Sequence, residues 1–243
     1  MQKYFKIITQ QEQDSDYKIM SATIAPNMIT DGLIFYLDAA NTKSYIGTGT
    51  SWNDISGFGR NGTLTNGPTF SNTNSGTITL DGTNDFVSIV SFSLVITGGT
   101  FITWIRRNGT QVDYSGLLYN RVSLGTGLAV GTSNRLGYSW NNESNTWGWN
   151  TNLTIPDLQL CMCAISVNST SAVAYICQSS GIASATNSVS HGSATLETLR
   201  VGYDGLSNRY FKGNVSQGLI YNRALSPTEI EQIFRTTKGR YGL

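Results

Sequence analysis

Aromatic and amide side chains gather in one short stretch of the sequence. Tyr138, Trp140, Trp147 and Trp149 flank a polar run that contains Asn142. Aromatic faces can stack on sugar rings, and amide groups hydrogen-bond sugar hydroxyls. These five residues are therefore a candidate glycan-binding set. A second interpretation stays open, in which Tyr138, Trp140 and Trp147 alternate into a protein core and serve only as scaffold.

An acidic turn is a candidate metal site. Asp81 is followed by Gly82, Thr83, Asn84 and Asp85. Calcium prefers several oxygen ligands on a tight turn, so Asp81, Asn84 and Asp85 could hold a structural Ca²⁺ ion. The alternative is an Asx-type turn, in which the Asp81 and Asn84 side chains hydrogen-bond their own backbone.

Three cysteines, Cys161, Cys163 and Cys177, lie close together in the sequence. If residues 168–170 form a turn, Cys161 faces Cys177 across an antiparallel pair, and a cross-strand disulfide is geometrically allowed. The alternative is three small buried apolar residues in a reducing compartment. A zinc site would need more cysteine or histidine ligands nearby than this segment has.

The composition indicates that strands position these residues. Charged residues make up 13% of the 243 residues, glycine occurs 26 times, and the formal net charge is +1. Low charge with many small and β-branched residues is typical of strands joined by tight turns. The absence of a basic stripe disfavours nucleic acid as a partner. No run of about 18 apolar residues exists, so no membrane-spanning segment is expected.

Short apolar or alternating runs, separated by turn dipeptides such as Asn61-Gly62 and Asp204-Gly205, predict an all-β fold. We expect a two-sheet antiparallel β-sandwich in which the first and last strands pair, because such returns let two sheets cover each other. The predicted strands are residues 33–37, 77–80, 86–89, 101–105, 117–119, 136–140, 161–167, 172–177, 199–201 and 215–221.

One short helix is predicted near the C-terminus. Residues 226–229, Ser-Pro-Thr-Glu, form a capping box with proline at the first helical position. Ile230, Ile233 and Phe234 then form an apolar stripe, and Gly239 is a plausible stop. We expect this helix to cover one edge or end of the sandwich.

Four motifs, in order along the chain, resemble those of a known family. Residues 32–41 contain an opening strand, residues 52–64 contain Trp-Asn-Asp-Ile-Ser-Gly and then Asn-Gly-Thr-Leu, and residues 80–87 read Leu-Asp-Gly-Thr-Asn-Asp-Phe-Val. Residues 211–226 resemble a closing strand and its Leu-Ser helix entry. Together these motifs are similar to the laminin-G-like modules of the concanavalin A-like lectin/glucanase superfamily. The resemblance implies a jelly-roll sandwich from about Gly32 to the C-terminus.

The resemblance bears on the two candidate sites. Related modules bind calcium with a loop like residues 81–85 together with an acid on the closing strand, but residues 215–219 here are Val-Ser-Gln-Gly-Leu. The missing carboxylate weakens the case for a metal cofactor. Similar tryptophan-rich hairpins recur in the family as scaffold, which favours the core interpretation of the aromatic cluster.

Catalysis is not supported by the acidic residues. Enzymes on this fold usually hydrolyse glycosidic bonds with two carboxylates, about 5 Å apart in retaining enzymes. The one cluster of acids, residues 12–16, lacks interleaved apolar residues and lies outside the predicted sandwich. His191 could act as a base, but a loop position without a catalytic role is the simpler interpretation. The remaining glutamates have no acidic partner at strand spacing: Glu143, Glu197, Glu229 and Glu231.

We therefore expect a non-enzymatic protein with two parts. Residues 1–28 would be an arm that docks onto other virion proteins or copies of the same chain, and residues 29–243 would be the laminin-G-like sandwich. Modules of this type occur in phage virion proteins and bacterial surface proteins, and no signal-peptide pattern precedes the sandwich. The first expectation is a capsid decoration or tail protein in the virion that binds host polysaccharide. The alternative is a secreted bacterial carbohydrate-binding module or cell-surface adhesin.

Overall fold

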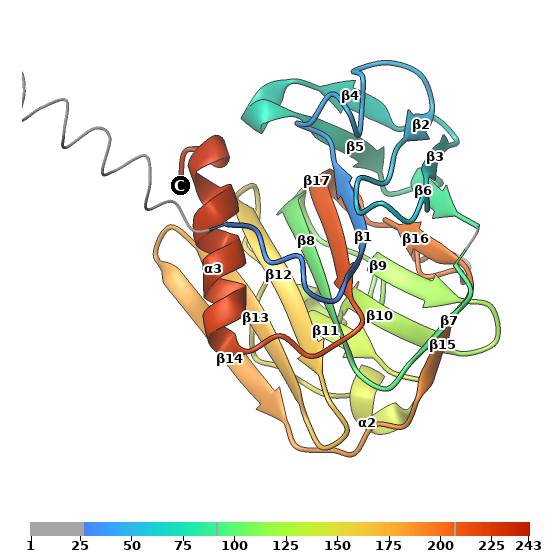
Figure 1. Cartoon of the computed structure of the whole chain (residues 1–243), viewed down its shortest axis with the longest axis vertical. Coiled ribbons are helices and arrows are strands. Elements are labelled where there is room, and N and C mark those ends of the chain that lie inside the picture. Colours follow the sequence, from blue (N-terminus) through green and yellow to red (C-terminus); the bar gives the residue numbers. More distant parts are fainter. Residues whose placement is uncertain (1–26, 91, 207) are drawn as a thin grey trace, which may run out of the picture.

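Two large antiparallel sheets lie face to face in the computed structural model, which describes residues 27–243 except positions 91 and 207 (Figure 1). This arrangement confirms the predicted all-β sandwich. The first sheet has eight strands. Its strands, in spatial order, are β14 (Gly181–Asn187), β13 (Ala172–Gln178), β12 (Leu160–Val167), β8 (Gly99–Arg107), β17 (Lys212–Tyr221), β5 (Thr77–Asp81) and β4 (Thr69–Ser71), and β1 (Leu33–Asp38) also pairs with β17.

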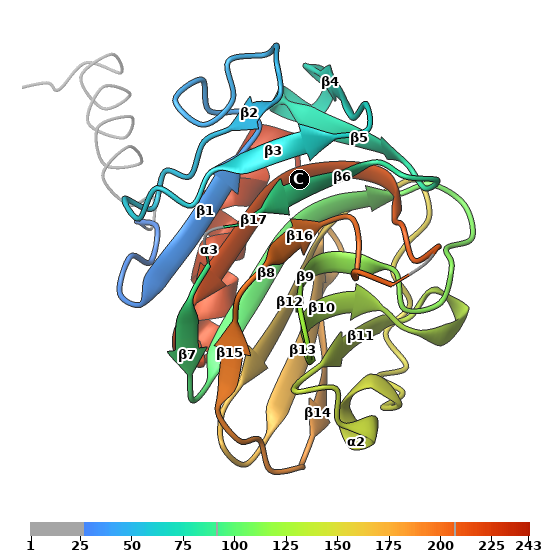
Figure 2. The same ribbon diagram turned by 90° about the vertical axis from the view of Figure 1, so that its right-hand side faces the viewer.

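The second sheet has seven strands and faces the viewer in Figure 2. Its order is β11 (Leu136–Ser139), β10 (Gly125–Val130), β9 (Gly116–Arg121), β16 (Leu199–Val201), β6 (Phe86–Ile89), β3 (Gly62–Thr65) and β2 (Ser51–Trp52). A separate two-stranded sheet pairs β7 (Leu94–Ile96) with β15 (Ala194–Leu196). The short helices are η1 (Thr73–Ser75), η2 (Thr132–Asn134), α2 (Ser144–Trp147) and η3 (Gly239–Tyr241).

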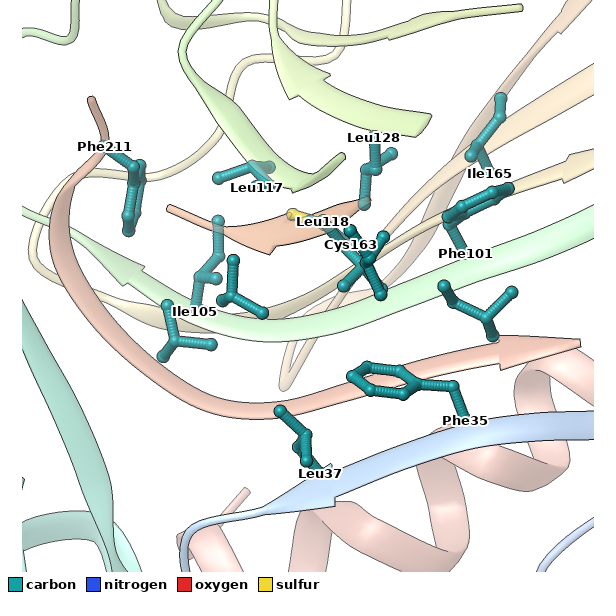
Figure 3. Close-up of a cluster of buried hydrophobic side chains, with 14 of the residues drawn as sticks. Phe35, Leu37, Phe101, Ile105, Leu117, Leu118, Leu128, Cys163, Ile165 and Phe211 are labelled. Atoms are coloured by element: carbon teal, nitrogen blue, oxygen red, sulfur yellow. The ribbon is translucent and has the colours of Figure 1, made fainter. Parts of the chain in front are cut away.

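The main core fills the space between the two sheets (Figure 3). Strand side chains alternate between the two faces of a sheet, so every second apolar residue points inward. Phe35 of β1 and Phe101 of β8 come from one sheet, and Leu118 of β9 and Leu128 of β10 come from the other. All four are fully buried, so the apolar alternation seen in the sequence builds the predicted interior.

Strand β17 holds the first sheet together. It pairs with β8 along one side, and with β5 and then β1 along the other. Leu33 at the start of β1 lies opposite Tyr221 at the end of β17. The predicted pairing of the first and last strands is thus confirmed.

Helix α3 (Pro227–Lys238) begins with the predicted capping box. Ser226 Oγ accepts a hydrogen bond from the Glu229 N–H, and Glu229 Oε2 accepts one from the Ser226 N–H. The helix covers the outer face of the eight-stranded sheet, not an edge or end of the sandwich as predicted (Figure 1). Phe234 stacks on Trp104 of β8 at 5.6 Å, and Trp104 Nε1 donates to Thr237 Oγ1 over 3.0 Å. The eight-stranded sheet is apolar on both faces at this point, and the apolar stripe of α3 shields the outer face from water.

No helix in the described residues, 27–243 without positions 91 and 207, is long and apolar enough to cross a membrane. Most of the predicted arm, residues 1–28, lies outside the described residues. Its last two residues are described: Asn27 O accepts a hydrogen bond from Gln232 Nε2 of α3 over 2.7 Å, and Met28 packs against the apolar cluster beneath that helix.

The three cysteines are free thiols. The predicted strand register, which placed Cys161 opposite Cys177 and so allowed a disulfide, is wrong. The hairpin pairs Met162, not Cys161, with Cys177. This shift by one residue points Cys161 and Cys163 into the inter-sheet core and Cys177 into the cluster beneath α3. A one-residue change of register exchanges the two faces of a strand, so Cys161 and Cys177 lie on opposite sides of the sheet. The buried-thiol alternative describes their packing.

Candidate functional site

A hollow lies on the outer face of the seven-stranded sheet, over β9, β10 and β11 and beside α2. Figure 2 shows how these elements are arranged. The volume of the hollow is about 270 Å³. Ala129 of β10 and Gly137 and Ser139 of β11 contribute to its lining, and these small side chains leave the sheet surface open. Its full lining is Tyr114, Tyr119, Arg121, Ala129, Val130, Gly131, Gly137, Tyr138, Ser139, Asn142, Trp147, Leu206 and Arg209.

Two features of the strands expose this surface. Leu117 and Leu118 are both part of the core, because the pairing of β9 with β10 shifts register at this point. After the bulge, Tyr119 and Arg121 face outward into the hollow. Gly125 on β10 lets Tyr119 approach closely, since a Cβ there would lie 2.5 Å from Tyr119 Oη.

Aromatic rings form one wall of the hollow. The rings of Tyr114 and Trp147 meet edge to face with centroids 5.8 Å apart. Trp147 closes α2 and is 41% exposed. The helix is fixed by buried Thr146, whose Oγ1 donates to Glu143 O over 2.7 Å and accepts the Trp140 N–H over 3.0 Å. Trp147 is therefore an exposed aromatic face on a supported backbone.

Positive charge forms the other wall. Arg121 and Arg209 both line the hollow and both approach Oδ2 of buried Asp204, at 3.5 and 3.0 Å. Arg121 Nη1 also lies 3.5 Å from Asn142 Oδ1, and the Arg209 guanidinium lies over the Tyr114 ring at 5.1 Å. The hollow thus combines flat apolar surface, amide and hydroxyl groups, and two cations.

The predicted glycan set divides between the hollow and the core. Asn142 and Trp147 line the hollow. Trp140 does not: it is 1% exposed, and its Nε1 donates to Gly192 O over 2.6 Å. Trp149 does not line it either, and packs half-buried against Tyr138 with ring centroids 5.9 Å apart. The scaffold interpretation, made for Tyr138, Trp140 and Trp147, describes Tyr138 and Trp140 but not Trp147.

Tyr138 borders the hollow, but its ring packs in the core. Its hydroxyl lies 2.9 Å from His191 Nε2 and accepts a hydrogen bond from Asn187 Nδ2 over 3.0 Å. His191 Nδ1 lies 3.0 Å from the Asn168 carbonyl, which can only accept, so Nδ1 carries the proton and Nε2 accepts from Tyr138. Burial lowers the pKa of His191, partly offset by that carbonyl. His191 is therefore a buried neutral link between loops.

The acidic turn uses its carboxylates on its own backbone. Asp81 Oδ1 accepts hydrogen bonds from the N–H groups of Thr83, Asn84 and Asp85, at 2.7, 3.2 and 3.3 Å. Desolvation opposes the charge, but these bonds outweigh it and lower the pKa of Asp81. Desolvation, and then the Asp81 charge, raise the pKa of Asp85. This is the Asx-type turn predicted for Asp81, whereas Asn84 takes part through its backbone N–H and not, as predicted, through its side chain. No group of three or more His, Cys, Asp or Glu residues that could hold a metal ion occurs in the described part of the chain.

No acidic side chain lines the hollow. Glu229 forms an ion pair with Arg223, and Glu231 with Arg235, both on or near α3. Glu143 caps α2 through its backbone, and the cluster at residues 12–16 lies outside the described residues. The hollow therefore contains the elements of a binding site but not the carboxylate pair of a glycosidase.

Several residues of the hollow were not predicted from the sequence: Tyr114, Tyr119, Arg121, Leu206 and Arg209. Tyr119 and Arg121 are two apart, and their outward alternation was the signal that could have found them. Tyr114 and Arg209 lie in separate loops, and only the folded chain brings them together.

Solved structures share this fold at low sequence identity. Domain 4 of the extracellular arabinanase AbnA from Geobacillus stearothermophilus, solved in complex with arabinotriose, has a TM-score of 0.65 and 17% identity, over 83% of this chain and 97% of that one. Trypanosoma rangeli sialidase in complex with sialic acid has a TM-score of 0.61 and 12% identity, over 95% of this chain. The binding domain of Paraclostridial Mosquitocidal Protein 1 has a TM-score of 0.59 and 18% identity, over 84% of this chain.

The chain spans 39% of the sialidase and 52% of the mosquitocidal binding domain. No curated protein sequence matches it. The family model of the concanavalin A-like lectin/glucanases superfamily, in its laminin-G type, matches residues 81–231, which is more than half of the chain. These residues contain the hollow, the strands beneath it and the start of α3. The chain belongs to the concanavalin A-like lectin/glucanase superfamily.

Proposed function

We propose that this protein is a non-catalytic carbohydrate-binding module and that the hollow over β9, β10 and β11 is its glycan site. The observation that supports this most directly is the placement of Trp147 and Tyr114 beside polar groups above a floor of small residues. An exposed aromatic face binds a sugar ring, while exposed Asn142 offers hydrogen bonds to its hydroxyls. The arabinotriose complex of the arabinanase domain supports a sugar ligand for this fold, since the chain covers 97% of that domain.

The size of the hollow sets the expected ligand. A volume of about 270 Å³ suits one or two sugar rings and not a long buried oligosaccharide. The rest of a polysaccharide would then lie outside the hollow, in solvent. This geometry fits recognition of a chain end or a short segment of a cell-surface polysaccharide.

A glycan array followed by calorimetric titration of the best ligand tests the proposal. Trp147→Ala is expected to lower the affinity for that ligand by about tenfold or more, because the stacking face is lost. Phe58→Ala removes another aromatic, 58% exposed, that does not line the hollow, and should leave affinity unchanged. Equal affinity in the wild-type and Trp147→Ala proteins, or no glycan bound at all, would contradict the assignment.

We further propose that the module works on a virion, as a capsid decoration or tail component that binds host polysaccharide, with residues 1–28 as the docking arm. The start of the described chain supports a fixed exit point, since Asn27 is hydrogen-bonded to α3, on the eight-stranded sheet, while the hollow lies on the other sheet. An arm leaving there would let the glycan site face away from the particle. A secreted bacterial module or surface adhesin would use the same geometry on a cell.

Deletion of residues 1–28 tests the arm. The shortened protein is expected to remain folded and to keep its glycan affinity but to lose incorporation into particles. Unchanged incorporation would refute the docking role. Neighbouring capsid and tail genes would favour the virion, and genes for polysaccharide degradation or an upstream export signal would favour the secreted module.

A further inference from the structure

The charges around the hollow do not balance. Three guanidinium groups lie together at this end of the second sheet: Arg121 and Arg209 in the lining, and Arg200, whose Nη1 donates to Arg121 O over 2.9 Å. A single carboxylate, that of Asp204, sits among them. None of the residues that line the hollow is acidic. In a chain whose net charge is only +1, this is a local excess of positive charge.

Asp204 fixes the positions of the arginines. Its side chain is 1% exposed and accepts from Arg209 Nη1 at 3.0 Å and from Arg121 Nη2 at 3.5 Å. Arg121 Nε donates to the Asp204 carbonyl over 2.9 Å. Because one buried acid faces two arginines, it orients both but neutralises only one.

Part of the Arg209 guanidinium has no hydrogen-bond partner among the described residues. Its Nη1 is bound to Asp204, while its Nε and Nη2 make no hydrogen bond to any residue in the described part of the chain. The Tyr114 ring beneath it, at 5.1 Å, limits its movement. The Arg209 side chain is about one-third exposed and lines the hollow. A planar fork of donors held in this way matches the two oxygens of a carboxylate.

We propose that the hollow selects saccharides that carry a carboxylate, such as a uronic or nonulosonic acid, with Arg209 as the contact and Arg121 as the second cation. This inference rests on the proposed glycan-binding function. Trp147, supported by Tyr114, would take the ring face, and Arg209 the acidic group at the ring's edge. A neutral sugar of the same size would leave the Arg209 donors unmatched.

Matched acidic and neutral sugars test the selection by calorimetric titration of the full chain. Tri-galacturonate is compared with galactotriose, and sialyllactose with lactose, at about 20 and about 300 mM salt. At least one acidic sugar is expected to bind about tenfold or more tightly than its neutral partner at low salt, because the bond is charge-assisted. The advantage should shrink at high salt. The identity of the preferred acidic sugar distinguishes the two sources of the carboxylate.

Two variants locate the effect. Arg209→Gln is expected to abolish the acidic preference, so that acidic and neutral sugars then bind with similar affinity. The matched control is Arg235→Gln on α3, which removes an exposed arginine on the other sheet and should preserve the preference. If Arg209→Gln does not fold, as shown by its melting curve, the salt dependence and the acidic-to-neutral ratio of the wild-type protein still decide.

The outcomes separate the two proposals. Equal affinity for acidic and neutral sugars, or preference for sulfated over carboxylated ones, overturns this inference and leaves the glycan-binding function standing. An acidic preference that survives in Arg209→Gln overturns the role of that residue. No binding of any sugar, acidic or neutral, overturns both.

Discussion

The edge of one ring rests against the face of the other where Tyr114 meets Trp147, with centroids 5.8 Å apart and an interplanar angle of 86°. Trp147 is the exposed face proposed to bind sugar. The Tyr114 ring also lies under the Arg209 guanidinium, at 5.1 Å. One tyrosine therefore supports both the aromatic and the cationic walls of the hollow.

Tyr114→Ala should lower glycan affinity without touching the sugar-stacking residue itself. Loss of an edge-to-face pair costs about 0.5–1.5 kcal/mol, so we expect the dissociation constant to rise by about two- to twelvefold. Titration calorimetry measures the change. Tyr114→Phe keeps the ring and should bind like the wild type; a loss as large as that of the alanine variant would show that the hydroxyl, and not the ring, is needed.

The buried His191 predicts a defined acid sensitivity. Burial lowers the folded-state pKa of His191 below its usual 6.5, so the unfolded chain binds a proton first as the pH falls. The contribution of neutral His191 to the free energy of unfolding is fully present above about pH 6.5. It is lost as the pH drops towards the folded-state pKa. Melting curves between pH 8 and about 5 should show this fall.

His191→Gln is the matched variant for that experiment. Glutamine can still accept from Tyr138 but does not titrate. Its melting temperature should fall less than that of the wild type over the same pH range, since only the carboxylates then contribute. Parallel curves for the two proteins would mean that His191 is not the titrating group.

The three thiols should be inert in the folded protein. Cys161, Cys163 and Cys177 are each fully buried, and burial raises the pKa of Cys177 to about 12. The thiolate is the reactive form, so a thiol reagent at neutral pH should label none of them in the native state and all three in guanidinium, without added reductant. Mass spectrometry counts the labels. Fewer than three labels in guanidinium would indicate a disulfide.

Calcium is expected to leave the protein's stability unchanged. Asp81 Oδ1 already accepts hydrogen bonds from three backbone N–H groups. The turn has only two carboxylates, those of Asp81 and Asp85, and the described residues place no third acid with them as a metal ligand. Scanning calorimetry in calcium and in chelator should give melting temperatures within about 1 °C, because a ligand that binds the folded state would raise the melting temperature. A shift of several degrees would instead support the metal.

The same turn gives a mutational check. Asp81→Ala leaves three N–H groups of the turn without their acceptor and should destabilise the protein by about 1 kcal/mol in either buffer. Thr83→Ala keeps the backbone N–H and should have little effect. A destabilisation of Asp81→Ala seen only in calcium would point back to ligation.

The strands that could be predicted from the sequence are those with apolar alternation, such as β8 and β17. Strands β10 and β14 were missed for a physical reason. Residues 125–130 contain two glycines and two other small residues, and residues 181–187 form an exposed edge with few apolar side chains. Neither has the periodic pattern that burial on one face produces. The closing helix was predictable because its cap and its apolar stripe are local.

The site was predictable only in part, for a related reason. Trp147 and Asn142 are near the right place in the sequence, and the structure puts them in the hollow. Trp140 is equivalent to Tyr138 by alternation, and the structure buries both rings in the inter-sheet core beside His191. Arg209 and Tyr114 meet through tertiary packing, which no local pattern records.

The position of β17 has a consequence for how the chain folds as it is made. Strands β1, β5 and β8 all pair with residues 212–221, which are synthesised long after them. Until those residues leave the ribosome, the first sheet has no centre and its strands have open edges. Such late, long-range pairing slows folding and exposes the nascent chain to aggregation. Loss of the last strand would therefore leave an aggregating fragment, not a smaller sandwich.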